Sequence, residues 1–178
     1  DRMTVLHHGR TLQTATPEAM LAQPASALVA RLTDQPNLFE GKVLQHLPAA
    51  DTTRIEWLGR PLLASHQPAF AVGETVSWLV PEAAVILVRE HQSERENTVT
   101  AVVSERLAWR GHATVSARVD GRREATLNFA IGAAVAQRRG IVPGASVPLQ
   151  LQKSAIRLLP GDVAIAGHAG TSGQGHSP

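Results

Sequence analysis

The sequence predicts a mainly β protein, with two small β-barrel modules in tandem behind a short α/β segment. Three observations carry this prediction. From residue 37 onward the chain is a series of short β-rich runs separated by Gly, Pro and Asp turns. The series beginning at Asn37 is similar to a second series beginning at Asn97. Residues 1–36 instead contain two strand-like segments followed by two helix-like segments.

The composition is that of a soluble globular protein. Apolar residues make up 43% and charged residues 18%, and 178 residues suffice to bury about 70% of the unfolded surface. A net charge of +2, spread among acidic residues, and only 3% aromatics do not indicate nucleic-acid binding. The absence of Cys excludes disulfides and thiolate metal sites and fits a reducing cytosol. No signal peptide or membrane-spanning run is recognisable.

Residues 1–36 begin with a predicted β-hairpin. Met3–Leu6 and Thr11–Thr14 are strand-like, and His8-Gly9-Arg10 between them suits a tight turn. A hairpin is the simplest interpretation of these two runs.

Two short helices should follow the hairpin. Thr16 is a hydroxyl N-cap before Pro17 and Glu18, which predicts a helix to about Gln23. After Pro24 breaks that helix, Ser26 can cap a second one, whose apolar residues lie on one face; these are Leu28, Val29 and Leu32.

The rest of the chain reads as two series of strands. The first series comprises Phe39–Leu47, Arg54–Leu58, Pro61–Ala64, Thr75–Val80 and Ala83–Val88. The second comprises Thr98–Trp109, Ala113–Val119, Glu124–Phe129, Ser146–Leu151 and Ala155–Leu159. Only Gly132–Arg139, rich in alanine, looks helical.

The two series look like copies of one unit. Asn37, Gly41 and Val43 match Asn97, Ala101 and Val103. Gly73, Val76, Val85 and Leu87 match Gly144, Val147, Ile156 and Leu158, at a larger offset along the chain. The larger offset places extra residues, including the predicted helix, inside the second copy. Each copy then has about five strands, as in a small closed barrel.

These patterns divide the chain into four parts. We expect the α/β segment at residues 1–36, the first module at 37–92, the second at 93–160, and a flexible tail rich in Gly, Ser and Thr at 161–178.

The N-terminal segment, residues 1–36, resembles the end of the ATP-binding subunit of ABC importers. "DRMTVLHHGRTLQTATPEAMLAQPASALVARLTDQPN" follows that family's order of A-D-R, a strand, a glycine turn, I-x-Q-x-G-T-P-E-E, a short helix and a closing asparagine. Ala15 stands where the family usually has glycine.

The remainder resembles the accessory region of such subunits, a pair of OB-like modules of the molybdate-binding (MOP, or TOBE) type. "ERENTVTAVV" resembles the S-A-R-N-x-L-x-G-x-V opening, "RRGIVPGASV" the L-G-L-x-x-G-x-x-V segment, and "QKSAIRL" the closing I-K-S-x-x-V strand. "VGETVSWLVPEAAVIL" resembles the closing strands of the first module.

The resemblance implies a regulatory domain cut from a parent ATPase. The sequence has no G-x-x-x-x-G-K-[ST] loop, so we expect this chain to lack ATPase activity and to need no cofactor, while ATP and Mg²⁺ belong to the parent subunit.

In the MOP-type family an oxyanion is held by the S-A-R-N and K-S segments, which makes five residues candidates for binding it. Lys153 and Ser154 match K-S, and one inserted residue would bring Ser93 and Arg95, with Asn97, into the other segment. Aligned directly on Asn97, Glu96 replaces the arginine and would repel an anion. The alternative is that Lys153 and Ser154 are exposed residues at the start of a strand. Pro81 and Glu82 replace Gln152 and Lys153 in the first module, so that copy is expected to be structural.

Other conspicuous residues are interpreted as structural. His7 and His8 would point to opposite faces of a strand, and His168 and His176 lie in the predicted tail, so no metal site is expected. The three tryptophans are expected in the core or a dimer interface; these are Trp57, Trp78 and Trp109.

The function implied by the resemblance is that of the regulatory and dimerisation domain of an ABC importer ATP-binding subunit. The expected partners are a second copy, the membrane permease subunits and an oxyanion such as molybdate, tungstate or sulfate, but no nucleic acid. Its location would be the cytoplasm, at the inner face of the membrane. The alternatives are a free-standing cytosolic oxyanion-binding protein, or the same domain of an iron, polyamine or sugar importer.

Overall fold

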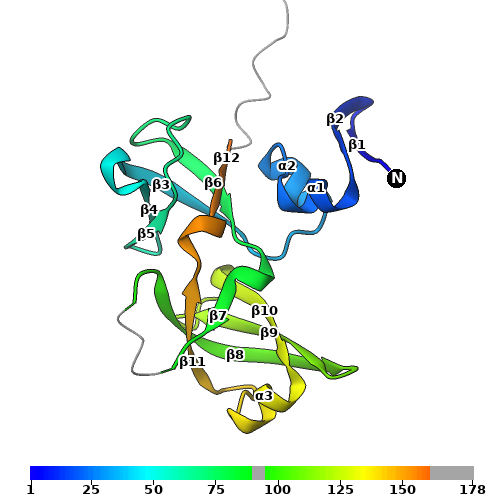
Figure 1. Ribbon diagram of the computed structural model, residues 1–178, viewed down its shortest axis with the longest axis vertical. Coiled ribbons are helices and arrows are strands. Elements are labelled where there is room, and N and C mark those ends of the chain that lie inside the picture. Colours follow the sequence, from blue (N-terminus) through cyan, green and yellow to red (C-terminus); the bar gives the residue numbers. More distant parts are fainter. Residues whose placement is uncertain (90–94, 161–178) are drawn as a thin grey trace, which may run out of the picture.

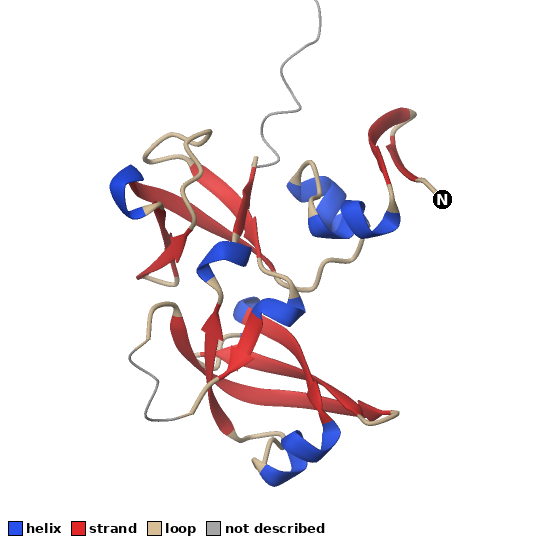
Figure 2. Ribbon diagram, in the orientation of Figure 1, coloured by secondary structure: helices blue, strands red, loops and turns tan. Residues whose placement is uncertain are grey.

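The structure, a computed structural model, describes residues 1–89 and 95–160. It contains a two-stranded hairpin and two five-stranded antiparallel sheets, which confirms a mainly β fold with two barrel-like units (Figures 1 and 2). The predicted flexible tail lies outside the described residues.

The N-terminal segment has the predicted elements. It comprises β1 (Met3–His7), β2 (Arg10–Ala15), α1 (Pro17–Ala22) and α2 (Ala27–Leu32). Both predicted N-caps are confirmed: Ala19 N donates to Thr16 Oγ1 at 3.2 Å, and Val29 N donates to Ser26 Oγ at 3.3 Å. These bonds satisfy N–H groups that a helix start leaves without a helical partner.

The first sheet has the strand order β12-β6-β3-β4-β5. Its strands are β3 (Leu38–Leu47), β4 (Thr52–Trp57), β5 (Arg60–Ala64), β6 (Thr75–Leu79) and β12 (Arg157–Leu159). The short helix η1 (Pro48–Ala50) joins β3 to β4.

The second sheet has the strand order β10-β9-β8-β11-β7. Its strands are β7 (Val85–Leu87), β8 (Thr98–Trp109), β9 (His112–Val119), β10 (Thr126–Gly132) and β11 (Ser146–Leu151). The predicted helix is present as α3 (Ala133–Arg138), between β10 and β11.

The two sheets exchange their closing strands. β7 follows β6 in the chain but pairs with β11, whereas β12 follows β11 and pairs with β6 (Figure 1). The two pairings are equivalent, because Gln150 lies opposite Ile86, and their counterparts in the repeat, Leu79 and Arg157, also lie opposite each other. Each sheet is therefore completed by a strand from the other half of the chain.

The internal repeat is visible in the local geometry. Gly73 and Gly144 have φ angles of 87° and 89°, a conformation that favours glycine. Gly73 N donates to Val43 O at 2.7 Å, and Gly144 N donates to Val103 O at 2.8 Å. The register also shifts just after Val43 and just after Val103.

Aromatic rings form the centre of the first barrel, which is the unit built on the first sheet; the second barrel is the unit built on the second sheet. Phe39, Trp57 and Trp78 are buried, and their ring centroids lie 4.9–5.1 Å apart. This core is continuous with that of the second sheet. Trp109 differs, because it lies at the end of β8 and is 72% exposed.

The closing strands are shorter than predicted. The short helices η2 (Glu82–Ala84) and η5 (Lys153–Ala155) occupy the starts of the runs expected as strands, and η4 (Arg123–Ala125) does so before β10. Each of the first two turns the chain from one sheet to the other, so a straight strand there would not reach its partner. Among the described residues, no helix has the length and apolar character needed to cross a membrane.

Candidate functional site

Lys153 lies in η5, where the chain passes from the second sheet to the first (Figure 1). Its Nζ donates to Thr52 Oγ1 at 2.5 Å and to Ala50 O at 3.2 Å. Its backbone oxygen accepts a hydrogen bond from Ser65 N at 3.3 Å. Lys153 thus ties the second half of the chain to η1, β4 and the end of β5.

Asn97 opens the second module and also bonds to β5. Its Oδ1 accepts from Leu63 N at 2.8 Å, and its Nδ2 donates to Leu63 O at 2.7 Å and to Leu151 O at 3.2 Å. With a φ of 57°, Asn97 is in the left-handed region, which Asn tolerates better than most residues. Its side-chain amide therefore joins the two barrels.

Asn37 makes the same contact from the first module. Its Nδ2 donates to Asn128 O at 2.8 Å, and its Oδ1 accepts from Asn128 N at 2.7 Å. The matched residues Asn37 and Asn97 thus each clasp one backbone residue of the opposite sheet. This reciprocal contact makes Leu63 and Asn128 equivalent positions of the two modules.

The structure brings two of the five predicted site residues to one edge of β5 and its continuation. Asn97 bonds to Leu63, and Lys153 bonds to Ser65, just beyond the end of β5. Ser154 is exposed beside Lys153 on η5, and Arg95 is exposed shortly before Asn97. Ser93 and Glu94 lie outside the described residues.

The groups at this edge of β5 offer one positive charge and few hydrogen-bond donors. A Lys ammonium carries three N–H donors, and Ala50 and Thr52 accept two of them. The remaining donor and the exposed Ser154 hydroxyl could serve an anion. Glu96 is exposed, and its backbone oxygen accepts from Gln150 Nε2 at 3.1 Å.

The equivalent positions of the first module offer no cation. Pro81 and Glu82 are the counterparts of Gln152 and Lys153 in the repeat, at the start of the equivalent short helix η2. A carboxylate in place of the ammonium would repel an anion. The chain thus crosses between the two sheets at η2 and at η5, and these two crossing points differ in charge despite their similar backbones.

Sequence reasoning missed a charged link between the modules. Arg60, at the start of β5, is paired with Asp120 in the turn after β9. It also missed His46, whose ring lies between Thr53 Oγ1 and Phe70 O at 3.0 and 2.7 Å. Neither link is predictable from spacing, because Arg60 and Asp120 belong to different modules and Phe70 lies in the chain beyond β5, far from His46 in sequence.

Within residues 1–89 and 95–160, no group of three metal-ligating side chains is found. His7 and His8 lie in the first hairpin with ring centroids 4.1 Å apart. Their planes are inclined at 70°, which is an edge contact between rings.

The architecture defines the class of fold: two OB-like, five-stranded modules in tandem, joined by exchanged closing strands. The sequence matches no protein-family model and no curated protein. Among solved structures, the fold is similar to that of ModG, described as a cytoplasmic molybdate-binding protein, in a crystal form with molybdate bound. The TM-score is 0.59 at 19% identity, over 72% of this chain and 98% of that one.

Proposed function

We propose that this chain is an oxyanion-binding module that serves as the regulatory and dimerisation domain of an ABC importer ATP-binding subunit. The observation that carries the proposal is its fold, which is shared with nearly the whole length of molybdate-binding ModG. Molybdate is the leading candidate ligand, with tungstate and sulfate as tetrahedral analogues. In this proposal the chain binds and does not catalyse.

The proposed anion site is the cationic crossing point at η5. Lys153 and Ser154 would donate to the oxyanion, and exposed Arg95 would add positive charge. Asn97 would hold the second module against β5 through its bonds to Leu63. Ser93 is the fifth proposed residue, next to this group in sequence.

Features of residues 1–36 support the proposed parent subunit. Leu6, Leu21 and Leu32 are 63%, 47% and 49% exposed and line one hollow beside the hairpin and helices. An apolar surface of this kind is typical of a contact with further protein. We infer that this surface packs on the remaining ATPase domain, which would place the chain in the cytoplasm beside the permease subunits.

Two alternatives follow from the same fold. The chain could act as a free-standing cytosolic oxyanion-binding protein; the similar structure ModG is described as a cytoplasmic molybdate-binding protein. It could also be the equivalent domain of an iron, polyamine or sugar importer, in which case the oxyanion would not bind.

Equilibrium dialysis with metal analysis tests the ligand. The purified chain should retain molybdate in a saturable manner, and tungstate should compete for it. Lys153→Ala should reduce retention at least about tenfold, because a charge-assisted donor is lost. Arg54→Ala, which removes a cation from an exposed position on β4, is the matched control. Failure to retain any of the three anions would refute the oxyanion role.

Sedimentation tests dimerisation separately. We expect a concentration-dependent dimer, with Trp109 in the contact because this large side chain is 72% exposed. Trp109→Ser should shift the equilibrium toward monomer. A monomer at every concentration would contradict the dimerisation role.

A further inference from the structure

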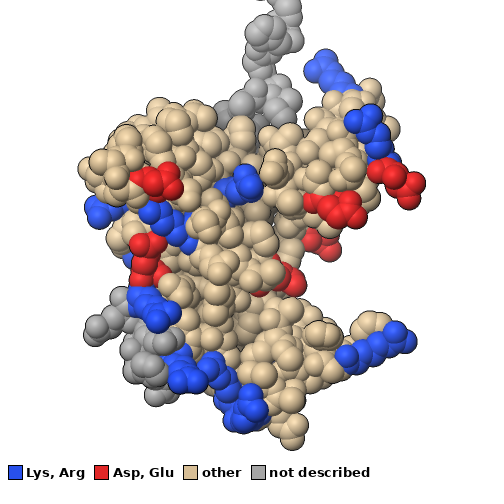
Figure 3. Space-filling view, in the orientation of Figure 1, with Lys and Arg blue, Asp and Glu red and all other residues tan. Residues whose placement is uncertain are grey.

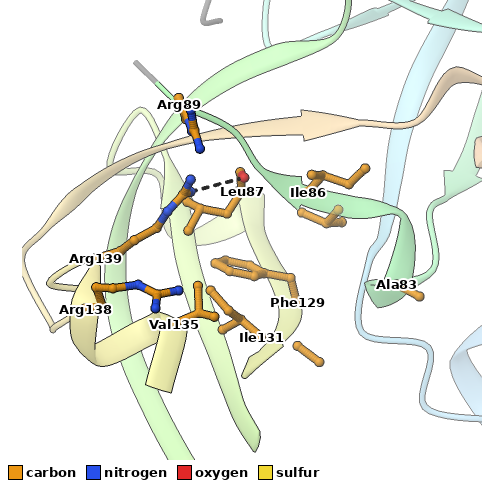
Figure 4. A pocket seen from close by; sticks show the side chains of 11 residues that line it. Ala83, Ile86, Leu87, Arg89, Phe129, Ile131, Val135, Arg138 and Arg139 are labelled. Carbon is orange, nitrogen blue, oxygen red and sulfur yellow. Dashed lines mark hydrogen bonds between the residues drawn. The ribbon is translucent and has the colours of Figure 1, made fainter. Parts of the chain in front are cut away.

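An open groove lies in the second barrel between β7 and β10, the two edges of its sheet. Its volume is about 690 Å³. Figure 4 shows an apolar floor of Phe129, Ile131 and Val135, with three arginines at one end. These arginines are Arg89, Arg138 and Arg139.

The backbone of β7 presents hydrogen-bonding groups to this groove. Gln152 N donates to Ala84 O at 3.0 Å, and Val88 N donates to Pro148 O at 3.1 Å. Even-numbered residues of this stretch therefore face β11, and in a strand the intervening residues face the other way. The N–H and C=O of Leu87 and the C=O of Val85 are thus directed away from β11.

The first barrel shows what such an edge binds. The groups that match those of Val85 and Leu87 lie on β12 and just before it, and belong to Ile156 and Leu158. Gln67 Nε2 donates to Ile156 O at 3.1 Å, and Leu158 N donates to Gln67 Oε1 at 2.9 Å. One primary amide therefore completes the outer edge in the way that a neighbouring strand would.

The second barrel lacks this amide. Counting from the equivalent residues Leu63 and Asn128, the position of Gln67 corresponds to Gly132, which has no side chain. Among the described residues, the side-chain hydrogen bonds to this end of β7 come from Arg139 Nη1, at 3.4 Å from both Leu87 O and Val88 O. Bonds of this length are weak, so an added amide would gain well-formed ones.

The charge of the groove selects the partner. None of the described residues that line it is acidic, whereas three are arginines. Figure 3 shows Lys and Arg side chains gathered at the lower left of the molecule, on the side of the second sheet. A ligand here should combine a backbone amide with carboxylates.

We propose that this groove binds an extended acidic peptide of a partner protein, which adds a short strand to β7. A peptide N–H would donate to Val85 O, and a peptide C=O would accept from Leu87 N, as the Gln67 amide does in the first barrel. Carboxylates would pair with Arg138 and Arg139, and apolar side chains would cover the partly exposed Ile131 and Val135. This mode uses main-chain bonds for affinity and side chains for selectivity. It is independent of the oxyanion proposal, because it uses none of the η5 residues.

Fluorescence polarisation tests the proposal with a labelled peptide of about eight alternating valine and glutamate residues. The peptide should bind saturably, and hydrogen exchange of the Leu87 amide should slow by about tenfold or more in the complex. The double substitution Arg138→Ser and Arg139→Ser should weaken binding about tenfold or more. The matched control, Arg122→Ser with Arg123→Ser, removes two exposed arginines from another turn and should change binding less than about twofold.

Modified peptides separate strand addition from simple anion binding. Two peptides carry methyl groups on alternate backbone nitrogens, one at the odd positions and one at the even positions. Only one of the two should lose binding, because alternate N–H groups of an added strand face β7. A valine–lysine peptide should not bind. Equal binding of every methylated peptide, equal binding of the lysine peptide, or unchanged exchange at Leu87 would each overturn the proposal. Displacement by inorganic phosphate as effective as by unlabelled peptide would also overturn it, since an anion alone would then explain the site.

Discussion

Asn37 and Asn128 lie far apart in the chain and are joined by two hydrogen bonds: Asn37 Nδ2 donates to Asn128 O at 2.8 Å, and Asn128 N donates to Asn37 Oδ1 at 2.7 Å. Asn97 makes the same pair of bonds to Leu63. A primary amide matches the donor and acceptor of a peptide group, so each asparagine acts as a short strand edge. These two contacts and the exchanged strands hold the modules together.

Replacing Asn37 should destabilise the whole protein. Asn37 is only 1% exposed, and Asn37→Ala would remove both partners of the Asn128 backbone. We expect the free energy of unfolding to fall by about 2–3 kcal/mol, the cost of unsatisfied buried polar groups. Urea unfolding measures this change. Gln45→Ala, at an exposed position on β3, should leave stability unchanged, and an equal effect of both substitutions would contradict the proposed clasp.

The Gln67 side chain should protect the outer edge of β12, in the first barrel, from hydrogen exchange. Gln67→Ala removes the bonds to Ile156 O and Leu158 N, so we expect faster hydrogen exchange at the Leu158 amide and a loss of about 1–2 kcal/mol in stability. Exchange measured by NMR gives the local effect. The Leu87 amide, on the edge of the other barrel, is the internal control and should exchange at its original rate; an unchanged rate at Leu158 would show that Gln67 does not protect this edge.

Lys153 and Thr52 should be coupled in stability. Their side chains are joined at 2.5 Å, and Thr52 is buried while Lys153 is partly exposed. A double-mutant cycle of Lys153→Met and Thr52→Val should give a coupling of about 1 kcal/mol in urea unfolding. Additive effects would mean that the contact contributes nothing to stability. Thr52→Val should still bind molybdate, because it retains the ammonium group.

Gly41 should not tolerate a methyl group. A Cβ at this position would lie 2.8 Å from Glu56 O and 3.2 Å from Trp78 Cδ1. The second copy holds Ala101 at the equivalent position, where the counterpart of Trp78 is the smaller Leu149. Gly41→Ala should therefore cost about 1–3 kcal/mol, measured by thermal or urea unfolding. Gly132→Ala, whose Cβ would meet only Val135 Cγ2 at 3.7 Å, is the control and should be nearly neutral.

The sequence predicted local structure well because local signals determine it. The bounds of β8 and β11 agree with the expected runs, and both helix starts follow from the hydroxyl caps Thr16 and Ser26. The repeat was also recognisable, since residues such as Gly73 and Gly144 occupy equivalent turns that need a positive φ.

The exchange of closing strands could not be predicted in the same way. Val85–Leu87 is apolar, with β-branched Val85 and Ile86, and would fit beside either β6 or β11, so the choice depends on contacts distant in sequence. The clasping role of Asn97 was missed for a similar reason: its partner Leu63 belongs to the other module and contributes only backbone atoms. When a side chain bonds to backbone atoms, its partner can be any residue type, so the sequence does not indicate which residue it contacts.

A crystal of this protein soaked with tungstate tests the central claim most directly, because the anomalous signal of tungsten locates the anion without assumptions about its ligands. We predict a peak at η5, within hydrogen-bonding distance of Lys153 Nζ and Ser154 Oγ, that is lost in Lys153→Ala. A peak confined to other surfaces, or no peak at a concentration that saturates binding in solution, would contradict the assignment of this crossing point as the oxyanion site.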